Sequence, residues 1–461
     1  MDTKKKRPFG WADRIGYAFG DFGNDFTFIL SSMFLMKFYT DIMGVSAAIV
    51  GIMMMVARFV DAITDVTMGQ IADRSPETAK GKFAPWLRRM CGPVAVASFL
   101  MYAIWLKNMP MTVKVIWMFA TYLLWGSVCY TGINIPYGSM ASAISAEPKD
   151  RASLSTWRSI GATLAGTAVG VILPMIVYYR DAAGRTKFNG EKMVIAAAVC
   201  SVLAVICYLL CYFLTTERVK IEAVEGKFSF VDLVKTTVAN RSMIGIILAA
   251  WFLLIAQLTL GSMANYIYPF YFNNAGVISS TNLINTVVTL VLSVFATQLS
   301  MKIGRREVGI VSSLIGAAAL IVAFVLRTRS VQTWLILYSI CYIGLAMFNL
   351  IVWAMITDVI DDIEVKRGER RDGAVYSVYS FARKLGQAAS SGVTGILLSA
   401  IGYTTITATS PSVVNGIYNI TCLVPAIGFI GLALMLIFVY PLSKKKVEEN
   451  ARFLADKKQK Q

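Results

Sequence analysis

The sequence contains no histidine and few charged residues: only 15% of its 461 residues are Asp, Glu, Lys or Arg. Without histidine there is no imidazole base, no catalytic triad that depends on one, and no histidine ligand for a transition metal. Carboxylates must therefore handle any proton that the protein moves. The seven cysteines lie in apolar segments at no zinc-like spacing, so we interpret them as small buried residues. We predict that the chain is not an enzyme.

Apolar residues make up 56% of the sequence, which is typical of a polytopic membrane protein. Segments long enough to cross a hydrocarbon core of ~30 Å recur along the chain. We predict an all-α fold with twelve transmembrane helices in two six-helix halves. The expected spans are 12–40, 45–72, 90–107, 112–143, 155–178, 193–215, 243–273, 281–301, 308–326, 333–358, 374–401 and 415–440.

The net charge of +17, from 44 Lys and Arg against 27 Asp and Glu, would also fit a nucleic-acid-binding protein. The positions of the basic residues argue against that function. If both termini lie in the cytoplasm, Lys and Arg concentrate in the inner tails and loops, as the positive-inside rule requires. The basic N-terminus, MDTKKKRP, has no signal-peptide cleavage site after it, so we expect an uncleaved cytoplasmic tail. We expect contact with the lipid bilayer and no nucleic-acid partner.

A long polar stretch divides the predicted spans into two sets of six. We expect an N-terminal six-helix half at 1–216 and a cytoplasmic middle loop at 217–242. A C-terminal six-helix half with a cytoplasmic tail should then occupy 243–461.

The two halves show traces of a repeat. Aligning Gly161 with Gly386 places Arg158 on Arg383 and Ser155 on Ser380, in the fifth span of each half. The loops after the second span of each half also match in position. These matches favour duplicated halves with a central site between them. That arrangement is the major facilitator architecture.

The second predicted span carries three charges near its middle, Arg58, Asp61 and Asp65. A charge at the bilayer centre costs roughly 2.5–3.5 kcal/mol on insertion scales, so this helix should face a polar interior. Asp61 and Asp65 share one helix face, and Thr64 and Thr131 add oxygen ligands that suit Na⁺ or H⁺. We predict a cation site in the N-terminal half. The alternative is a structural salt bridge between Asp61 and Arg58.

Further polar side chains are concentrated in spans one, four, five, ten and eleven, whereas spans three, six, nine and twelve are almost purely apolar. Helices that line a hydrophilic cavity need polar groups, and outer supporting helices do not. We therefore predict a substrate site. Its candidate residues are Asn24, Asp25, Tyr130, Asn134, Arg158, Asn349, Trp353, Ser380, Arg383 and Lys384.

Several of these side chains have a simpler alternative role. Asp25 fits a helix-end residue near the membrane interface. Arg158, Arg383 and Lys384 fit cations that extend toward the inner surface or bind lipid headgroups. Trp353 fits a packing residue as well as a platform on which a sugar ring stacks. For Asp21, which shares a face with Asp25, we favour a packing or gating role.

Five segments together resemble a known family: GDFGNDF, RFVDAITDVTMG, GKFAPW, NIPYGSM and YSFARKLGQA. They are similar to segments of the glycoside–pentoside–hexuronide:cation symporters of the major facilitator superfamily, and closer to the glucuronide and pentoside branch than to the melibiose permease. The resemblance covers nearly the whole chain. It implies a coupling-cation site at the matching positions Asp61, Thr64, Asp65 and Thr131. It implies sugar contacts at the matching positions Asp25, Asn134, Arg158 and Lys384.

This sequence departs from the melibiose permease at three positions. Asn134 stands where that permease has an acidic residue, and Gly138 stands where it has tryptophan. Arg383 adds a positive charge that the permease lacks. These differences make the predicted cavity less negative and favour an anionic sugar such as a glucuronide.

The sequence thus predicts a monomeric, multi-pass symporter of the bacterial plasma membrane, with both termini in the cytoplasm. Its expected substrate is a glycoside, namely a glucuronide, another uronide or a pentoside. It should carry this substrate together with Na⁺ or H⁺ by alternating access. We expect no cofactor beyond the coupling ion. We assign Arg58 a structural role in the empty site. The alternatives are a symporter of neutral oligosaccharides and a lysolipid-type symporter. A membrane enzyme or receptor is a further alternative from a different class.

Overall fold

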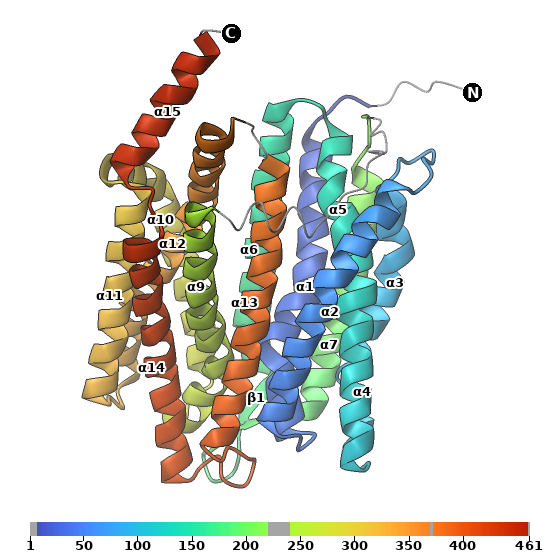
Figure 1. Ribbon diagram of the computed structural model, residues 1–461. Coiled ribbons are helices and arrows are strands. Elements are labelled where there is room, and N and C mark those ends of the chain that lie inside the picture. Colours follow the sequence, from blue (N-terminus) through green and yellow to red (C-terminus); the bar gives the residue numbers. More distant parts are fainter. Residues whose placement is uncertain (1–6, 220–239, 369–371, 460–461) are drawn as a thin grey trace. The chain divides into compact units, whose positions relative to one another are not determined.

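The structure is a computed structural model that describes residues 7–219, 240–368 and 372–459 (Figure 1). Its contacts divide the chain into two compact units of packed helices. The first unit comprises Met1–Gly226 together with Tyr403–Thr407. The second comprises Lys227–Gly402 and Ala408–Gln461. The segment Tyr403–Thr407 therefore belongs to the first unit although the chain on both sides of it belongs to the second.

The first unit contains seven α-helices, a π-helical segment, a short 3-10 helix and one β-hairpin among its described residues. The helices are α1 (Trp11–Asp41), α2 (Ala47–Asp73), α3 (Ala84–Leu100), η1 (Ile104–Leu106), α4 (Met111–Leu123), η2 (Leu124–Tyr130), α5 (Thr131–Ile144), α6 (Pro148–Val177) and α7 (Gly190–Leu214). The hairpin pairs β1 (Tyr178–Arg180) antiparallel with β2 (Thr186–Phe188). The hairpin is a small departure from the predicted all-α chain, and it lies in the connection between α6 and α7.

The second unit is also a bundle of long helices. They are α9 (Arg241–Tyr266), η3 (Ile267–Tyr271), α10 (Gly276–Ile303), α11 (Arg305–Leu326), α12 (Val331–Arg367), α13 (Asp372–Ala400), α14 (Pro411–Leu434), η4 (Met435–Val439) and α15 (Lys444–Gln459). The helix α15 follows the last predicted span and occupies the predicted C-terminal tail. Residues 220–239, which make up most of the predicted middle loop at 217–242, lie outside the described residues.

Each of the twelve predicted spans coincides with a long helix or with consecutive helical segments of the structure. Ten of these are long and apolar enough to cross a membrane among the described residues. The spans outside that set, α1 and α13, carry polar and charged side chains along their length. These are two of the helices that the sequence predicts to line a polar interior.

Local sequence signals explain several helix ends. Ser46 precedes α2, and its hydroxyl accepts a hydrogen bond from the backbone N–H of Ile49. Asn189 precedes α7 and caps the N–H of Lys192 in the same way, at 3.0 Å. At the end of α12, Gly368 adopts φ 79°, a left-handed conformation that glycine reaches without a steric penalty. These caps satisfy backbone groups that have no partner within the helix.

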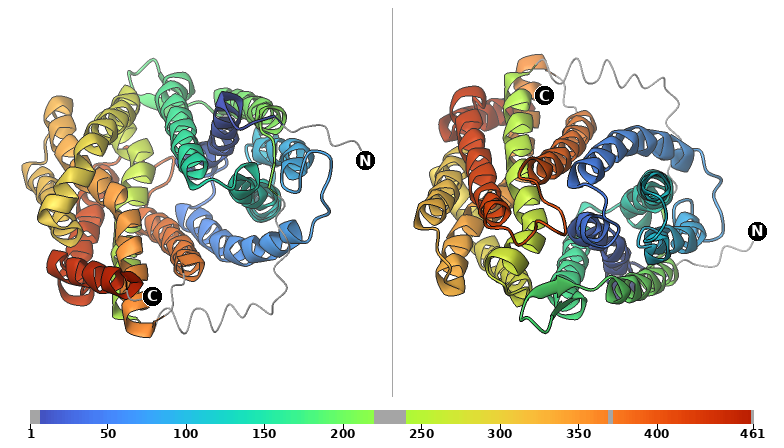
Figure 2. Two further views of the ribbon diagram at one scale, coloured as in Figure 1. Left: turned by 90° about the horizontal axis from the view of Figure 1, so that it is seen from above. Right: turned by 90° about the horizontal axis from the view of Figure 1, so that it is seen from below.

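Two glycines allow α1 to approach its neighbours closely. The helix α1 packs between α6 and α7 (Figure 2). A Cβ at Gly161 of α6 would lie 2.2 Å from the carbonyl oxygen of Ala18, and a Cβ at Gly20 would lie 2.1 Å from the Tyr137 ring. Any larger residue at either position would push the helices apart. This close contact sets the distance between the polar faces of α1, α5 and α6.

The residues that follow α7 are anchored to the start of α3. The Glu217 carboxylate is buried and accepts hydrogen bonds from the backbone N–H groups of Lys82, Phe83 and Ala84, at 2.7, 3.0 and 2.5 Å. A negative charge at a helix N-terminus satisfies unpaired N–H groups and complements the helix dipole. The predicted middle loop therefore begins with a residue that is fixed within the first unit.

Replacing Glu217 with alanine should destabilise the first unit by on the order of 2–3 kcal/mol, because buried N–H groups lose their acceptor. Thermal unfolding of the purified protein in detergent measures the effect. Glu191→Ala is the matched control, since Glu191 lies exposed in the first turn of α7. Equal melting temperatures for the two variants would contradict the anchoring role.

Candidate functional site

The carboxylate of Asp61 on α2 is buried and has a partner on each oxygen. Its Oδ1 accepts a hydrogen bond of 2.6 Å from the hydroxyl of Ser127. Its Oδ2 lies 3.3 Å from Nη1 of Arg58, three residues earlier on the same helix. The Arg58 guanidinium also lies over the ring of Phe28 on α1, 5.1 Å from the ring centroid. The predicted Arg58–Asp61 pair therefore exists, and a second helical segment contributes to it.

Asp65 lies one turn further along α2, and its Oδ1 is 2.8 Å from the hydroxyl of Thr131. The same hydroxyl is 3.1 Å from the carbonyl oxygen of Gly126. Thr64 donates its hydroxyl to the backbone carbonyl of Asp61 at 3.2 Å. Asp61, Asp65 and Thr131 thus lie in one cluster of oxygen atoms, and the Thr64 hydroxyl is bonded to its own helix at the edge of that cluster.

A π-helical turn brings the partner groups of this cluster together. Gly126 and Ser127 belong to η2, and Thr131 begins α5, so α4, η2 and α5 form one continuous helical run. Single π-turns within α-helices are rare and often lie at functional sites. A Cβ at Gly126 would lie 3.3 Å from Asp61 Oδ1, so glycine leaves room for the carboxylate.

Two carboxylates, Asp61 and Asp65, lie one helical turn apart in this cluster, and Asp61 pairs with the guanidinium of Arg58. A buried carboxylate is costly unless a positive group, a counter-ion or a proton neutralises it. Hydroxyl and carbonyl oxygens surround the two acids. Hard oxygen donors of this kind suit small cations.

A second polar cluster joins α1 to α6. Nε of Arg158 lies 3.2 Å from Oδ2 of Asp21, and the guanidinium lies over the ring of Tyr137, 5.3 Å from its centroid. Tyr137 in turn donates its hydroxyl to the carbonyl oxygen of Tyr17 at 2.6 Å. Arg158 thus pairs with the carboxylate for which we favoured a packing or gating role. Its side chain remains 40% exposed, which leaves it accessible.

Asn24 connects three helices of the first unit. Its amide donates to Asn134 Oδ1 at 3.2 Å and to Asp21 Oδ1 at 3.4 Å. Its own oxygen accepts a hydrogen bond of 2.9 Å from the hydroxyl of Tyr208 on α7. Asn24 is buried, whereas Asn134 is half-buried. The amide of Asn24 therefore fixes the positions of Asp21 and Asn134 at the edge of the cluster.

Asp25 and Tyr130 complete the predicted set in this unit. Within 7–219, 240–368 and 372–459, Asp25 has no hydrogen-bond or ion-pair partner, although it is only partly exposed. The ring of Tyr130 stacks on Phe28 and packs against Trp125, with centroids 5.9 and 5.4 Å away. A half-buried carboxylate without a partner, next to a paired one, can accept hydrogen bonds from a polyhydroxylated ligand.

The predicted residues of the second unit form two local groups. Asn349 on α12 donates to Oε1 of Gln257 on α9 at 3.2 Å. Arg383 on α13 lies over the ring of Trp353, 5.6 Å from its centroid. Trp353 packs edge-on against Tyr379 and remains 42% exposed. Ser380 is exposed and Lys384 is half-buried, both on α13.

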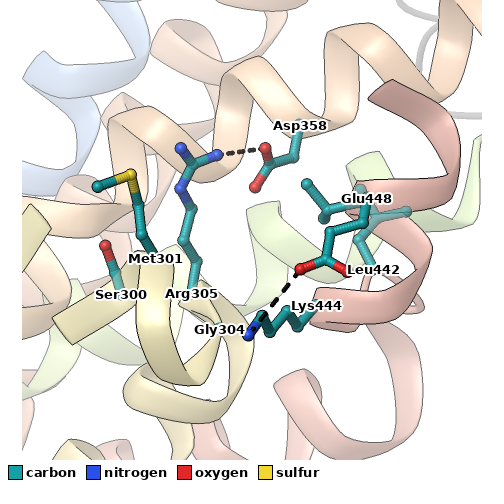
Figure 3. A pocket seen from close by; sticks show the side chains of 9 residues that line it. Ser300, Met301, Gly304, Arg305, Asp358, Leu442, Lys444 and Glu448 are labelled. Carbon is teal, nitrogen blue, oxygen red and sulfur yellow. Dashed lines mark hydrogen bonds and ion pairs between the residues drawn. The ribbon is translucent and has the colours of Figure 1, made fainter. Parts of the chain in front are cut away.

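The second unit also holds a charged cavity of about 170 Å³ that the sequence did not indicate (Figure 3). Arg305 pairs there with Asp358, and Lys444 of α15 faces Glu448 at 3.9 Å. Apolar side chains, including Leu442, make up much of its wall. None of the predicted site residues lines this cavity.

Three groups of the two clusters escaped the sequence interpretation, the Ser127 hydroxyl, the Gly126 carbonyl and Tyr208, and so did Gln257, the partner of Asn349 in the second unit. Ser127 had a usable signal, because it lies four residues before Thr131. Tyr208 had none, since it belongs to a span that is almost purely apolar. The structure adds one polar contact from that span, because the Tyr208 hydroxyl donates to Asn24.

A family model described as MFS/sugar transport protein matches residues 16–444. The chain belongs to this family. It is therefore a multi-pass membrane transporter and not an enzyme, and the predicted resemblance to the glycoside–pentoside–hexuronide symporters of the major facilitator superfamily is confirmed.

Relatives match this chain along almost its whole length. The uncharacterized symporter YjmB of Bacillus subtilis is 32% identical over 100% of this chain and 97% of that protein. The glucuronide carrier protein homolog of Escherichia coli is 30% identical over 95% of this chain and 94% of that protein. The isoprimeverose transporter of Lactiplantibacillus pentosus is 29% identical over 98% of this chain and 92% of that protein.

Solved structures share the fold at much lower identity. A bacterial homologue of the human lysosomal transporter Spinster has a TM-score of 0.68 at 14% identity, with 95% of this chain and 97% of that chain covered. A D-xylose-proton symporter has a TM-score of 0.59 at 15% identity, with 93% and 96% covered. These likenesses agree with the predicted major facilitator fold.

Proposed function

We propose that this transporter carries a glycoside into the cell together with Na⁺ or H⁺. The observation that carries the proposal is the cluster around Asp61 and Asp65, where two carboxylates, two hydroxyls and one arginine meet within the membrane-spanning part of the first unit. The two carboxylates provide negatively charged oxygens to which a monovalent cation or a proton would bind. No cofactor beyond the coupling ion is needed.

The cation would bind between Asp61 and Asp65, with Thr131 and Ser127 as hydroxyl ligands and Thr64 at the edge. Arg58 would hold Asp61 in place when the site is empty, because it removes part of the negative charge. Binding of the cation makes the interior less negative and so favours the binding of sugar. By linkage, sugar raises the affinity for the cation by the same factor.

In this proposal the sugar contacts the second cluster of the first unit and the polar residues of the second unit. Arg158, Asp25 and Asn134 supply donors and acceptors for sugar hydroxyls or a carboxylate. Asn24 and Tyr130 shape this side of the site. The second unit would contribute Asn349, Trp353, Ser380, Arg383 and Lys384.

We propose a glucuronide, another uronide or a pentoside as the substrate. Two arginines, Arg158 and Arg383, support an anionic sugar, and one relative is a glucuronide carrier homolog. A neutral glycoside is the second candidate. It is favoured by the pairing of Arg158 with Asp21, which already neutralises the guanidinium in the absence of substrate.

Transport would proceed by alternating access in a monomer of the bacterial plasma membrane, with both termini in the cytoplasm. The experiment that tests this function is uptake into vesicles that contain the purified protein. Labelled glucuronides, xylosides and galactosides are each offered with an imposed Na⁺ gradient or an imposed pH gradient. Accumulation of one class with one gradient supports the proposal, and no ion-dependent accumulation of any sugar rejects it.

Ser127→Ala tests the ion site at a residue that was not among the candidates from the sequence. A hydrogen bond to a charged group contributes about 1.5–3 kcal/mol, so the cation concentration for half-maximal uptake should rise at least about tenfold. Ser139→Ala is the matched control, because Ser139 donates to a carbonyl oxygen of its own helix, that of Ile135. An unchanged cation dependence in the Ser127 variant would remove this residue from the site.

A further inference from the structure

One charged cluster of the first unit has no part in the proposed ion and sugar sites. Lys37 lies in the last turns of α1 and is only 1% exposed. Its Nζ is 2.7 Å from Oδ2 of Asp41 and donates a hydrogen bond of 3.0 Å to the hydroxyl of Tyr403. The Tyr403 hydroxyl in turn donates to Oδ1 of Asp41 at 2.7 Å. The three side chains form a closed ring of polar contacts.

The hydroxyl of Tyr403 joins the two charged groups of the ring. A phenol hydroxyl is both a donor and an acceptor, so it can accept from an ammonium and donate to a carboxylate at the same time. Tyr403 is itself only 4% exposed, and the Lys37 Nζ lies 5.5 Å from the centroid of its ring. A buried lysine and a nearly buried aspartate are costly to leave incompletely paired. The ring therefore binds Tyr403 tightly.

Tyr403 contacts the first unit although its neighbours in the chain belong to the second. Tyr403 lies between α13 and α14, two helices of the second unit, yet Tyr403–Thr407 belongs to the first unit. The chain returns to the second unit at Ala408. Polar contacts between Thr404 and Thr407 close the short segment on itself. The first unit thus holds a loop whose two ends belong to the second unit.

We propose that Lys37 and Asp41 of the first unit form a docking site for Tyr403 of the α13–α14 loop. We call these three side chains the latch, and we propose that their contacts must break during transport. This inference rests on the proposed alternating-access cycle, in which the two halves change their arrangement. Because α1 begins in the predicted cytoplasm, its end at Asp41 lies toward the predicted outer face. The latch therefore acts at the outer side of the transporter.

Tyr403→Phe removes the hydroxyl and keeps the ring. Spin labels at Ile406→Cys, an 89% exposed position, and at Trp105→Cys, a 51% exposed position of the first unit, report the distance between loop and unit. The native cysteines are buried and should remain unlabelled. The unmodified latch should give one narrow distance distribution. With Tyr403→Phe the released fraction should rise about tenfold or more, as the loss of hydrogen bonds to charged groups implies.

Tyr102→Phe is the matched control. It removes another buried tyrosine hydroxyl of the first unit, which donates to the carbonyl oxygen of Leu30 at 3.1 Å. This control should keep the narrow distribution. A distribution in the Tyr403 variant that is as narrow as in the control would overturn the docking site.

The transport role of the latch has its own test. A bifunctional maleimide, matched in length to the measured distance between the two cysteines, should stop uptake when it joins them, and a monofunctional maleimide should not. Full uptake by the joined protein would overturn the latch. Absence of uptake before any reagent is added would instead reject the proposed function, and the spin-label distances would still report on the docking of the loop.

Discussion

Replacing Asp65 with asparagine should abolish ion-driven accumulation of sugar while the protein still folds. The side chain keeps its shape and its contact with the Thr131 hydroxyl, but it loses the negative charge of the carboxylate. One positive charge moved through 100 mV supplies about 2.3 kcal/mol, which corresponds to roughly fiftyfold accumulation of a neutral sugar. In the variant, the ratio of internal to external sugar should fall to about one.

The measurement is the steady-state accumulation of labelled sugar in vesicles with an imposed ion gradient and membrane potential. Asp73→Asn is the matched control, because Asp73 is an exposed residue at the end of the same helix. The control should accumulate sugar as the unmodified protein does. Concentrative uptake by the Asp65 variant at the level of the control would show that the cation does not bind at this carboxylate.

Replacing Arg158 with glutamine should weaken sugar binding. If the guanidinium donates charge-assisted hydrogen bonds to the sugar, its loss costs about 1.5–3 kcal/mol and raises the half-saturating sugar concentration about tenfold to hundredfold. The effect should be larger for a glucuronide than for a neutral glycoside, because only the glucuronide presents a carboxylate. Sugar binding is measured directly by titration calorimetry at a saturating cation concentration.

A second substitution, at Asp21, distinguishes two explanations for a lower sugar affinity in the Arg158 variant. If Arg158 serves only to neutralise Asp21, the double variant Asp21→Asn with Arg158→Gln should recover normal affinity. If Arg158 contacts the sugar, the double variant should remain as weak as the single one. A double-mutant cycle gives this coupling, because the two side chains are in contact. Recovery of affinity would return Arg158 to a structural role.

The helices and the Arg58–Asp61 pair were accessible from the sequence because they depend on local information. Apolar length located the spans, and a spacing of three residues on one helix placed Arg58 beside Asp61. The link between Asp65 and Thr131 was also within reach, through the family resemblance.

Contacts between distant segments were not accessible in this way. The spacing of four residues between Ser127 and Thr131 is a local signal, but the bond between Ser127 and Asp61 also depends on the π-turn in η2 and on how α2 packs against it, and neither of these leaves a periodic signal. The sequence assigned no role to Lys37, since its partner Tyr403 lies 366 residues further along the chain. The sequence offered Asp21, Asp25, Asp61 and Asp65 as acidic partners for Arg158, and the structure pairs it with Asp21, where Gly161 lets α6 approach α1 closely.

The central claim is that one site in this transporter couples an ion to a sugar, and sugar-driven ion movement tests it most directly. Vesicles containing the protein are loaded with an ion-sensitive dye for Na⁺ or pH, and a sugar gradient is imposed without any ion gradient. We expect sugar entry to drive one of the two ions inward in the unmodified protein, and no ion movement with Asp65→Asn. Sugar entry at a normal rate with no movement of either ion would contradict the account.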